Sequence, residues 1–413
     1  MSPRPRELTY AEARERVLAA AVPLPAAHEP IARALGRALR RDLVAPHALP
    51  PFDNSAMDGW AVIAADLASA SPNAPVRVPV TGVAAAGRPL ERVLARGEAA
   101  LVMTGAPIPA GTDAVVPFED GSREDGDAAA RFTLPVRAGA NIRRAGEDVT
   151  AGEVALAAGR ELSAHDLALA ASLGFAEVEL SPAPRVAVLS TGDELLDPGE
   201  PLRPGAIRDS NLPMLAMLVT QAGGVLTLAE RLPDDAARVA ERVREAVEVS
   251  DVVLTIGGVS AGDFDPVKQA LDAIGEIELW RVAMRPGRPQ AFGAPHGRLF
   301  FGLPGNPASV ACVFEALVRP ALRKLQGHAA LDRPRVPVRL ASDLESRAGR
   351  TDFVRCALEW RLGALWALPA GAQVSGHLTP QSRAHALLVV PEDAGRLQRG
   401  DEAEALLLRM PEA

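Results

Sequence analysis

The sequence predicts a multidomain protein built around an α/β domain with a mostly parallel sheet. The chain has 413 residues, of which 48% are hydrophobic, so it is too long for one ordinary core and can fill three or four domains. Strand and helix patterns alternate from residue 183 to about 326, which is typical of a parallel sheet covered by helices. Stretches of short strands, separated by glycine and proline, lie before and after this segment.

The N-terminal part begins with helical patterns and then becomes rich in β-strands. Thr9-Tyr-Ala-Glu12 has the pattern of a capping box and predicts a helix from Ala11 to Ala21. A second short helix is predicted over residues 28–35. From about residue 48 to 146, glycine, proline and short β-branched runs predict a β-rich insertion. A helix over residues 163–173, ended by Gly174, follows it.

The α/β segment ends its strands in loops that suit an anionic ligand. Its strands are predicted at 186–189, 225–228, 252–256, 277–282, 290–292 and 299–302. Its helices are predicted after Asp209-Ser-Asn211, from a cap at Asp234 to about residue 249, near 266–274, and from Asn306-Pro307. Ligands of such sheets bind beyond the carboxyl ends of the strands. After Pro334, short strands at 336–340, 353–360, 365–368, 386–390 and 402–408 predict a small barrel or sandwich.

Composition excludes several classes of function. The formal net charge is −8 without a long run of either sign, so nothing indicates a nucleic-acid or acidic-membrane partner. No apolar run reaches membrane-spanning length, and the apolar patch near residues 17–27 follows a charged helical run rather than a signal-peptide pattern. Cys312 and Cys356 have no zinc or disulfide spacing. We therefore expect a cytoplasmic protein.

Three glycine-containing loops follow predicted strands of the α/β segment. They are Ser190-Thr-Gly-Asp-Glu194, the run from Gly257 to Gly262 with Asp263 and Asp265 after it, and Leu303-Pro-Gly-Asn-Pro307. Backbone N–H groups in such loops bind phosphates, and carboxylates bind hard cations. Each loop alone is also explained as a turn or a helix start, but together they predict a phosphate and metal site. The predicted substrate-binding residues are Ser190, Thr191, Gly192, Gly257, Gly258, Ser260 and Gly262.

Arg285-Pro-Gly-Arg-Pro289 places two guanidinium groups on a loop stiffened by proline. Such a loop suits a tetrahedral oxyanion, and its alternative interpretation is a solvated basic turn. The chain has no GxxxxGK[ST] motif and no GxGxxG after a strand, so common NTPase and dinucleotide-binding sites lose their main support. Gly258-Val-Ser-Ala-Gly262 matches GxSxG, but no helix pattern follows it directly, and an acyl hydrolase is only a minor alternative.

The motifs, taken in order, resemble one family along nearly the whole chain. They are Pro51-Phe-Asp-Asn-Ser-Ala-Met-Asp-Gly-Trp-Ala61, Met103-Thr-Gly-Ala-Pro107, Asn141-Ile-Arg-Arg-Ala-Gly-Glu-Asp148, Ser190-Thr-Gly-Asp-Glu-Leu195, Gly257-Gly-Val-Ser260 and Gly302-Leu-Pro-Gly-Asn-Pro307. This set resembles the molybdopterin molybdenumtransferase family, which contains the bacterial MoeA proteins and the E domain of gephyrin.

The resemblance implies an architecture and a reaction. It implies a helical linker domain (residues 1–47 and 147–182), an inserted β-rich domain (48–146), a three-layer α/β molybdopterin-binding domain (183–327) and a C-terminal β-barrel (328–413). It also implies a homodimer with composite active sites and a transient contact with the enzyme that adenylylates molybdopterin. The implied reaction is the Mg²⁺-dependent insertion of molybdate into adenylylated molybdopterin, with release of AMP.

The resemblance assigns roles to residues whose positions match the family's motifs. The implied catalytic residues are Asp58, Thr104, Asp148, Glu194, Asp234 and Asp265, with Glu194 and Asp265 as metal ligands. The implied molybdate-binding residues are Arg285, Arg288, Ser309, Arg350 and Ser375. The chain departs from the family pattern in having arginine at 285 and 288, where lysine is usual, and Trp60, where tyrosine is usual. Two alternatives stay open: a non-catalytic molybdopterin-binding scaffold and a molybdopterin adenylyltransferase.

Overall fold

The structure, a computed structural model, describes residues 6–257 and 277–411. The chain divides into two compact units, which we describe separately. Unit 1 comprises Met1–Arg40, Ala158–Leu162 and Glu177–Ala413, and unit 2 comprises Arg41–Ala157 and Ser163–Ala176. The finer division into four domains remains a prediction. The predicted helix at 266–274 lies outside the described residues.

Unit 1 contains the mostly parallel sheet that the sequence predicts. Strands β17 (Val225–Leu232), β14 (Arg185–Thr191), β18 (Val252–Ile256) and β21 (Leu299–Leu303) are neighbours in this order, and all their pairings are parallel. Antiparallel pairings then add β20 (Pro289–Gly293) and β19 (Ile277–Arg285), and β1 (Arg6–Thr9) joins β19 in parallel. The carboxyl ends of β14, β18 and β21 therefore lie at one edge.

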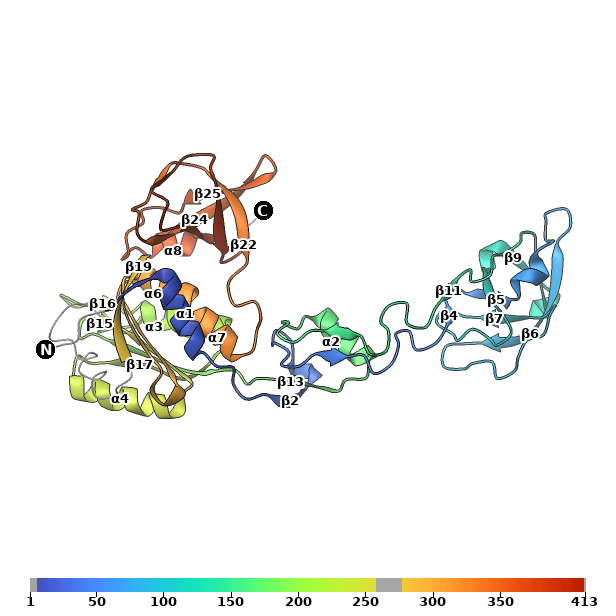
Figure 1. Cartoon of the computed structure of the whole chain (residues 1–413), viewed down its shortest axis with the longest axis horizontal. Coiled ribbons are helices and arrows are strands. Elements are labelled where there is room, and N and C mark those ends of the chain that lie inside the picture. Colours follow the sequence, from blue (N-terminus) through green and yellow to red (C-terminus); the bar gives the residue numbers. More distant parts are fainter. Residues whose placement is uncertain (1–5, 258–276, 412–413) are drawn as a thin grey trace. The chain divides into compact units, whose positions relative to one another are not determined.

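The side chains of these strands alternate between two hydrophobic cores, which makes the domain three-layered. Val186 and Val188 pack into one core together with residues of α1 (Tyr10–Ala20), α3 (Asn211–Gln221), α6 (Pro307–Val313) and α7 (Arg319–Leu325). Ala187 and Leu189 pack into the other core against α4 (Ala236–Val249). Figure 1 shows α4 on the opposite side of the sheet from α1 and α7. The period-two alternation of a buried strand thus fixes the fold class.

Two local predictions for unit 1 are wrong. Residues 28–35 form β2 (Ala27–Pro30) and a short 3₁₀ turn, because strand pairing with β13 (Glu177–Leu180) satisfies this backbone, and Pro30 cannot donate a helical hydrogen bond. Helix α4 is capped by Asp235, which accepts from the N–H of Arg238, rather than by Asp234. In contrast, the Thr9–Glu12 capping box is confirmed at the start of α1.

The C-terminal strands close into a five-stranded barrel, which decides between barrel and sandwich. Strand β24 (Thr351–Arg361) pairs with β25 (Ala364–Pro369), then β22 (Arg335–Leu340), β28 (Glu402–Leu407) and β26 (Ala386–Val390) follow, and β26 pairs with β24 again. Met284 and Arg285 of β19 also pair with Thr351 and Asp352 of β24. This pairing joins the α/β sheet to the barrel.

Unit 2 is a β-rich body with one helix. Its six-stranded sheet has the order β8 (Ala114–Pro117), β5 (Gly59–Val62), β7 (Ala99–Val102), β6 (Val76–Ala84), β10 (Ala129–Phe132) and β9 (Gly121–Glu124). Trp60 is 1% exposed and contacts Phe118 and Phe132 edge-on, so the indole fills a core in which a phenolic hydroxyl would need a partner. Helix α2 (Ala164–Ser172) lies where the sequence predicts a helix, and it starts from a capping box at Ser163.

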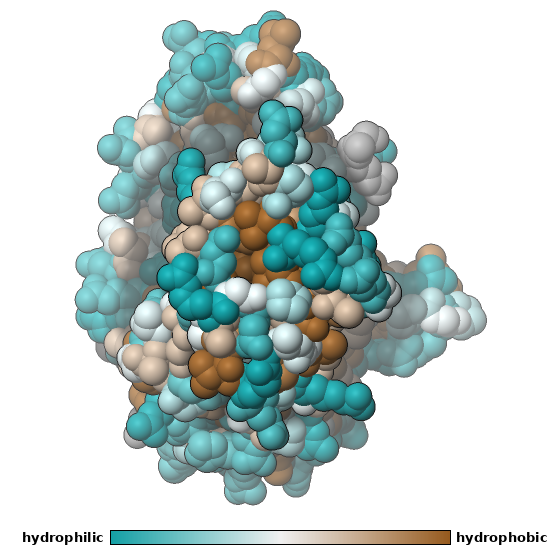
Figure 2. Space-filling model, turned by 90° about the vertical axis from the view of Figure 1, so that its right-hand side faces the viewer, coloured by the Kyte–Doolittle hydropathy of each residue, from teal (hydrophilic) through white to brown (hydrophobic). Residues whose placement is uncertain are grey.

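Short elements complete both units. They are β3 (Leu43–Val44) with β12 (Val154–Leu156), β4 (Asn54–Ser55) with β11 (Ile142–Arg143), β15 (Leu195–Leu196) with β16 (Ile207–Arg208), β23 (Leu344–Glu345) with β27 (Arg396–Leu397), a π-helical turn (Phe314–Val318) and α8 (Thr379–Arg383). The surface in Figure 2 is mostly hydrophilic and carries small, separate apolar patches. Scattered apolar side chains of this kind are ordinary on a protein surface.

Candidate functional site

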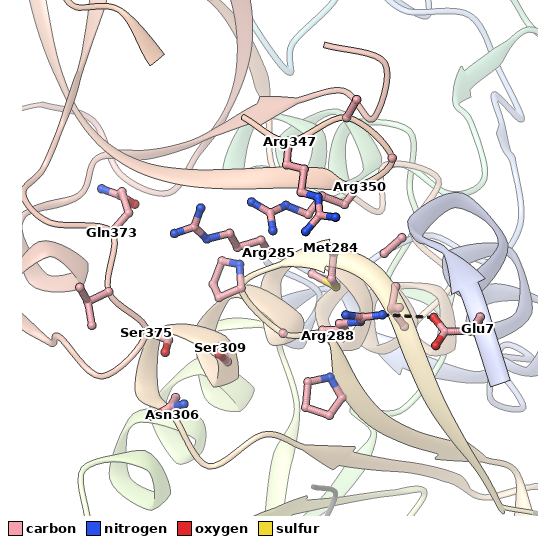
Figure 3. Close-up of a pocket in the computed structure, with 18 residues that line it drawn as sticks. Glu7, Met284, Arg285, Arg288, Asn306, Ser309, Arg347, Arg350, Gln373 and Ser375 are labelled. Atoms are coloured by element: carbon pink, nitrogen blue, oxygen red, sulfur yellow. Dashed lines mark ion pairs between the residues drawn. The ribbon is translucent and has the colours of Figure 1, made fainter. Parts of the chain in front are cut away.

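A basic pocket of about 890 Å³ lies where the α/β domain meets the barrel. All five residues predicted to bind molybdate line it, although they come from four separate segments of the chain. Figure 3 shows Arg285 at the end of β19, Arg288 on the loop that follows, Ser309 on α6, and Arg350 and Ser375 on segments of the barrel. The structure thus brings together residues that are 90 positions apart (375 − 285). Their role in binding molybdate remains a prediction.

The loop from Arg285 to Pro289 is held in one shape by two hydrogen bonds and by a glycine with a positive φ. The N–H of Val282 donates to the carbonyl of Arg288 at 2.8 Å. The buried amide of Gln290 donates to the carbonyl of Gly287 at 2.6 Å. Gly287 has a φ of +109°, and a Cβ there would lie 2.5 Å from Cγ2 of Val313 on α6. Glycine is therefore required, and both guanidinium groups project from a fixed backbone.

A buried arginine, Arg355 on β24, organises the segment that carries Ser375. Arg355 is only 2% exposed. Its guanidinium donates to the carbonyls of Val374 and His377, each at 3.1 Å, and its backbone N–H donates to the side chain of Gln373 at 3.0 Å. Burial lowers the pKa of Arg355, and the positive charge of Arg285 lowers it further, although Cys312 opposes this. Sequence reasoning missed this residue because a strand arginine carries no motif.

Ser309 and Ser375 line the pocket on two neighbouring segments of the chain. Ser309 follows Pro307 in the first turn of α6 and is 5% exposed. The N–H of Ala308 donates to the carbonyl of Ser375 at 3.0 Å, which ties the barrel segment to the start of this helix. Two hydroxyl groups therefore lie on the side of the pocket opposite Glu7, as Figure 3 shows. Hydroxyl groups and guanidinium groups together suit a tetrahedral oxyanion.

The carboxyl edge of the parallel sheet holds the second predicted group. Ser190, near the end of β14, is fully buried, and its Oγ has no hydrogen-bond partner among the residues that the structure describes. Thr191 donates its hydroxyl to the carbonyl of Ile256 at 3.3 Å. Gly192 and Gly257 both have positive φ values, 152° and 88°, so they form turns that side chains disfavour. Gly258, Ser260, Gly262 and Asp265 lie outside the described residues.

Asp234 faces the glycine-containing loop rather than capping a helix. The N–H of Asp193 donates to Oδ2 of Asp234, and the N–H of Asp234 donates to Oδ1 of Asp193, both at 3.2 Å. This reciprocal pair joins the ends of β14 and β17. Glu194 is exposed beside it, and the N–H of Ile207 donates to the backbone carbonyl of Glu194 at 2.8 Å. Three carboxylates thus lie in neighbouring loops of this sheet edge.

Oxygen ligands of this kind are the ones that Mg²⁺ prefers. Within residues 6–257 and 277–411, however, no group of three His, Cys, Asp or Glu side chains is close enough to hold a metal ion. Of the two predicted metal ligands, only Glu194 is described. The described carboxylates therefore agree with the chemistry of a magnesium site without completing one.

Sequence reasoning also missed three buried polar residues near this edge. Asp209 is 4% exposed, and its Oδ1 accepts from the N–H groups of Asn211 and Leu212 at 2.9 and 3.0 Å, whereas its Oδ2 has no partner within residues 6–257 and 277–411. Asn211 donates to the carbonyl of Gly305 at 2.7 Å, and within the same ranges its Oδ1 is unpaired, as is Oγ1 of the fully buried Thr255. Buried oxygens without a partner are rare and favour a ligand nearby. The run Asp209-Ser-Asn211 was the available signal, but it also explains a helix start.

In unit 2 the structure brings two of the three predicted residues together. Both the N–H and the hydroxyl of Thr104 donate to Oδ1 of Asp58, at 2.6 and 2.8 Å. These two hydrogen bonds hold the pKa of Asp58 below its usual range. Gly59 is required next to Asp58, because a Cβ there would lie 2.0 Å from the carbonyl oxygen of Val116. Asp148 is exposed, and its N–H donates to the carbonyl of Leu49 at 3.1 Å.

The fold defines a multidomain protein of the α/β class, and a basic pocket lies between its α/β domain and its barrel. Three family models match successive parts of the chain: the MoeA N-terminal region (domain I and II) over residues 8–174, a probable molybdopterin binding domain over 187–324, and the MoeA C-terminal region (domain IV) over 337–408.

Curated relatives and solved structures agree with these matches. The chain is 39% identical to molybdopterin molybdenumtransferase 2 of Mycobacterium tuberculosis, over 91% of this chain and 93% of that protein. It is 36% identical to the molybdopterin molybdenumtransferase of Haemophilus influenzae, over 84% and 85%. The moeA protein of Pyrococcus horikoshii OT3 superimposes with a TM-score of 0.83 at 30% identity, covering 97% of this chain and all of that one. The chain therefore belongs to the molybdopterin molybdenumtransferase family.

Within the described ranges, no helix combines the length and the apolar character that crossing a membrane requires.

Proposed function

We propose that this chain is a molybdopterin molybdenumtransferase, which inserts molybdate into adenylylated molybdopterin and releases AMP. Family membership supports the reaction class. The observation that carries the proposal is the arginine-lined pocket, in which Arg285, Arg288, Ser309, Arg350 and Ser375 converge from both domains of unit 1. A pocket of this charge and these hydroxyl groups fits a tetrahedral metal oxyanion.

Each of the two groups of residues binds one of the two anionic substrates. The arginine pocket holds molybdate, and the loops at Ser190–Glu194 and Gly257 lie where phosphates of adenylylated molybdopterin bind in a parallel sheet. Cleavage of the adenylate, an activated anhydride, supplies the driving force for metal insertion. The residues that we assign to this chemistry bind the two anions and orient them. Holding the reacting groups close together in the correct orientation is what accelerates the reaction.

Magnesium dependence is part of the proposal. Bound Mg²⁺ would neutralise charge on the phosphates, with Glu194 and Asp265 as oxygen ligands. A Mg²⁺ titration of AMP release by Asp265→Asn protein tests this. A right-shifted Mg²⁺ dependence supports the role of Asp265, and an unchanged wild-type profile makes Asp265 structural.

We further propose that the protein acts as a cytoplasmic homodimer with composite sites. The family resemblance supports this arrangement, in which Asp58, Thr104 and Asp148 of unit 2 complete the active site of the partner subunit. The two buried thiols of Cys312 and Cys356 suit a reducing compartment. A transient contact with the molybdopterin adenylyltransferase would pass the adenylylated substrate on without dilution.

Three measurements on the same protein separate the proposed activity from its two alternatives. AMP release from adenylylated molybdopterin is measured with and without molybdate. Release that depends on molybdate supports the transferase. Tight binding of the substrate without any AMP release would make the chain a scaffold, and formation of adenylylated molybdopterin from ATP and molybdopterin would make it an adenylyltransferase. Ser375→Ala protein serves as a matched variant, because it removes one pocket hydroxyl and should slow the molybdate-dependent reaction only.

A further inference from the structure

The basic pocket contains four arginines, but two of them already have a carboxylate partner. Arg350 donates to Asp352 with Nε at 2.7 Å and Nη2 at 3.3 Å. Arg288 forms a longer ion pair with Glu7, at 3.6 Å between Nη2 and Oε2. In the part of the chain that the structure describes, the guanidinium groups of Arg285 and Arg347 form no hydrogen bond or ion pair, yet both line the pocket.

We propose that Arg347 is a further oxyanion-binding residue and that, with Arg285, it supplies the main positive charge of the pocket. The inference rests on the proposed function and deepens it. Two unpaired guanidinium groups carry a charge of about +2, which is equal in magnitude and opposite in sign to the charge of a molybdate dianion. Arg285 enters from the α/β domain and Arg347 from the barrel, and Figure 3 shows both side chains directed into the same space.

The backbone around Arg347 is anchored on both sides, so the side chain starts from a fixed position beside the pocket. The hydroxyl of Ser346 donates to Asp352 at 2.9 Å, and the N–H of Ser346 donates to the carbonyl of Gly395 at 2.9 Å. On the other side, Gly349 has a φ of +86°, and its N–H donates to the carbonyl of Glu392 at 2.7 Å. The segment between β23 and β24 therefore presents Arg347 at the mouth of the pocket while its neighbours are anchored to the barrel.

The pairing of Arg350 explains why a further arginine is needed. The carboxylate of Asp352, which is 4% exposed, accepts hydrogen bonds from Nε and one Nη of Arg350. These two nitrogens form one edge of the planar guanidinium group. Arg350 is thereby well oriented, but its charge is offset by Asp352. Arg347 has its complete fork available for two parallel hydrogen bonds to a tetrahedral oxyanion, a geometry that lysine does not reproduce.

Calorimetric titration of the full-length protein with molybdate alone tests the proposal. Arg347→Gln should weaken molybdate binding roughly tenfold or more, the effect of losing a charge-assisted hydrogen bond, and Arg347→Lys should weaken it less. The matched control is Arg399→Gln, since Arg399 is an exposed barrel arginine that does not line the pocket. The control should stay within about twofold of the wild type, because distant exposed charges are screened by salt.

The possible results separate this inference from the proposed function. If the wild type binds molybdate and Arg347→Gln binds it as tightly as Arg399→Gln does, Arg347 is a solvated surface arginine and the inference fails alone. If the wild type binds no molybdate, the proposed function fails and takes the inference with it. Because Arg347 is exposed, its substitution should leave thermal unfolding unchanged, and a lowered melting temperature with unchanged molybdate binding would also overturn the assigned role.

Discussion

Removing the carboxylate of Glu7 should make the protein bind molybdate more tightly, because Glu7 places an anion inside a pocket that suits an anion. Glu7 lies on β1, opposite Arg281 in the register with β19. Its two oxygens lie 3.6 Å from Arg281 and 3.6 Å from Arg288. Figure 3 shows the pair of Glu7 and Arg288 at one end of the pocket. Molybdate must therefore compete with Glu7 for Arg288.

The size of the effect follows from the exposure of the pair. The side chains of Arg288 and Glu7 are 64% and 62% exposed, and such ion pairs contribute about 0–1 kcal/mol. Breaking the ion pair between Glu7 and Arg288 therefore reduces the free energy of molybdate binding by at most about 1 kcal/mol. A unit charge about 6 Å from a dianion adds a repulsion of about 1 kcal/mol in water before salt screening. Together these terms predict that Glu7→Gln tightens molybdate binding roughly two- to tenfold.

A double-mutant cycle, measured by calorimetric titration with molybdate, checks the reasoning. Arg288→Gln alone should weaken molybdate binding by roughly 1.5–3 kcal/mol, and Arg288→Lys clearly less. In protein that already carries Arg288→Gln, the increase in molybdate affinity caused by Glu7→Gln should be smaller. Only the repulsion between the Glu7 carboxylate and molybdate is then removed. Glu404→Gln is the control, since Glu404 is also 62% exposed and ion-paired but lies outside the pocket lining. An unchanged or weakened affinity in Glu7→Gln would refute the competition.

Three further predictions concern other parts of the chain. Arg355→Met should destabilise the fold by about 1–3 kcal/mol in denaturant titrations and also weaken molybdate binding, because the Ser375 segment loses its buried donors, whereas Arg355→Lys should restore part of both. Burial lowers the pKa of His328 to about 4, below its unfolded value near 6.5. Stability should therefore fall on the order of 2–3 kcal/mol as the pH drops from about 6.5 to 4, and urea unfolding of His328→Gln protein should lack this slope. Mixing Asp58→Ala with Asp265→Ala subunits should recover roughly a quarter of the wild-type activity if the sites are composite, and no recovery despite proven exchange of subunits would contradict that.

The fold class could be predicted because buried strands and helices leave recognisable patterns of apolar residues in the sequence. Val252–Ile256 is buried at every position and is apolar except for Thr255, which is typical of a parallel strand covered on both faces. The barrel strands are short runs separated by glycine and proline, so their positions were also predictable. Where local signals compete, prediction failed: residues 28–35 favour a helix locally, but pairing with β13 overrides that preference.

The site was predictable only where residues belong to a motif. Arg285 and Arg288 stand in one short loop, and the family resemblance supplied Ser309, Arg350 and Ser375. Nothing in the sequence near Glu7 or Arg347 indicates a pocket. These residues reach it through long-range pairing, whose partners a single sequence does not reveal.

The geometry of the pocket depends on backbone register rather than on loop flexibility. Strand β19 ends in the arginine loop, and its last residues, Met284 and Arg285, pair in parallel with Thr351 and Asp352 at the start of β24. Asp352 in turn orients Arg350 and receives the hydroxyl of Ser346, so one carboxylate positions both sides of the Arg347 segment. A shift by one residue in this pairing would turn Asp352 to the opposite face of the sheet, and the fixed orientation of Arg350 would be lost. The two domains can therefore share this basic pocket only while the two-residue register between their sheets is maintained.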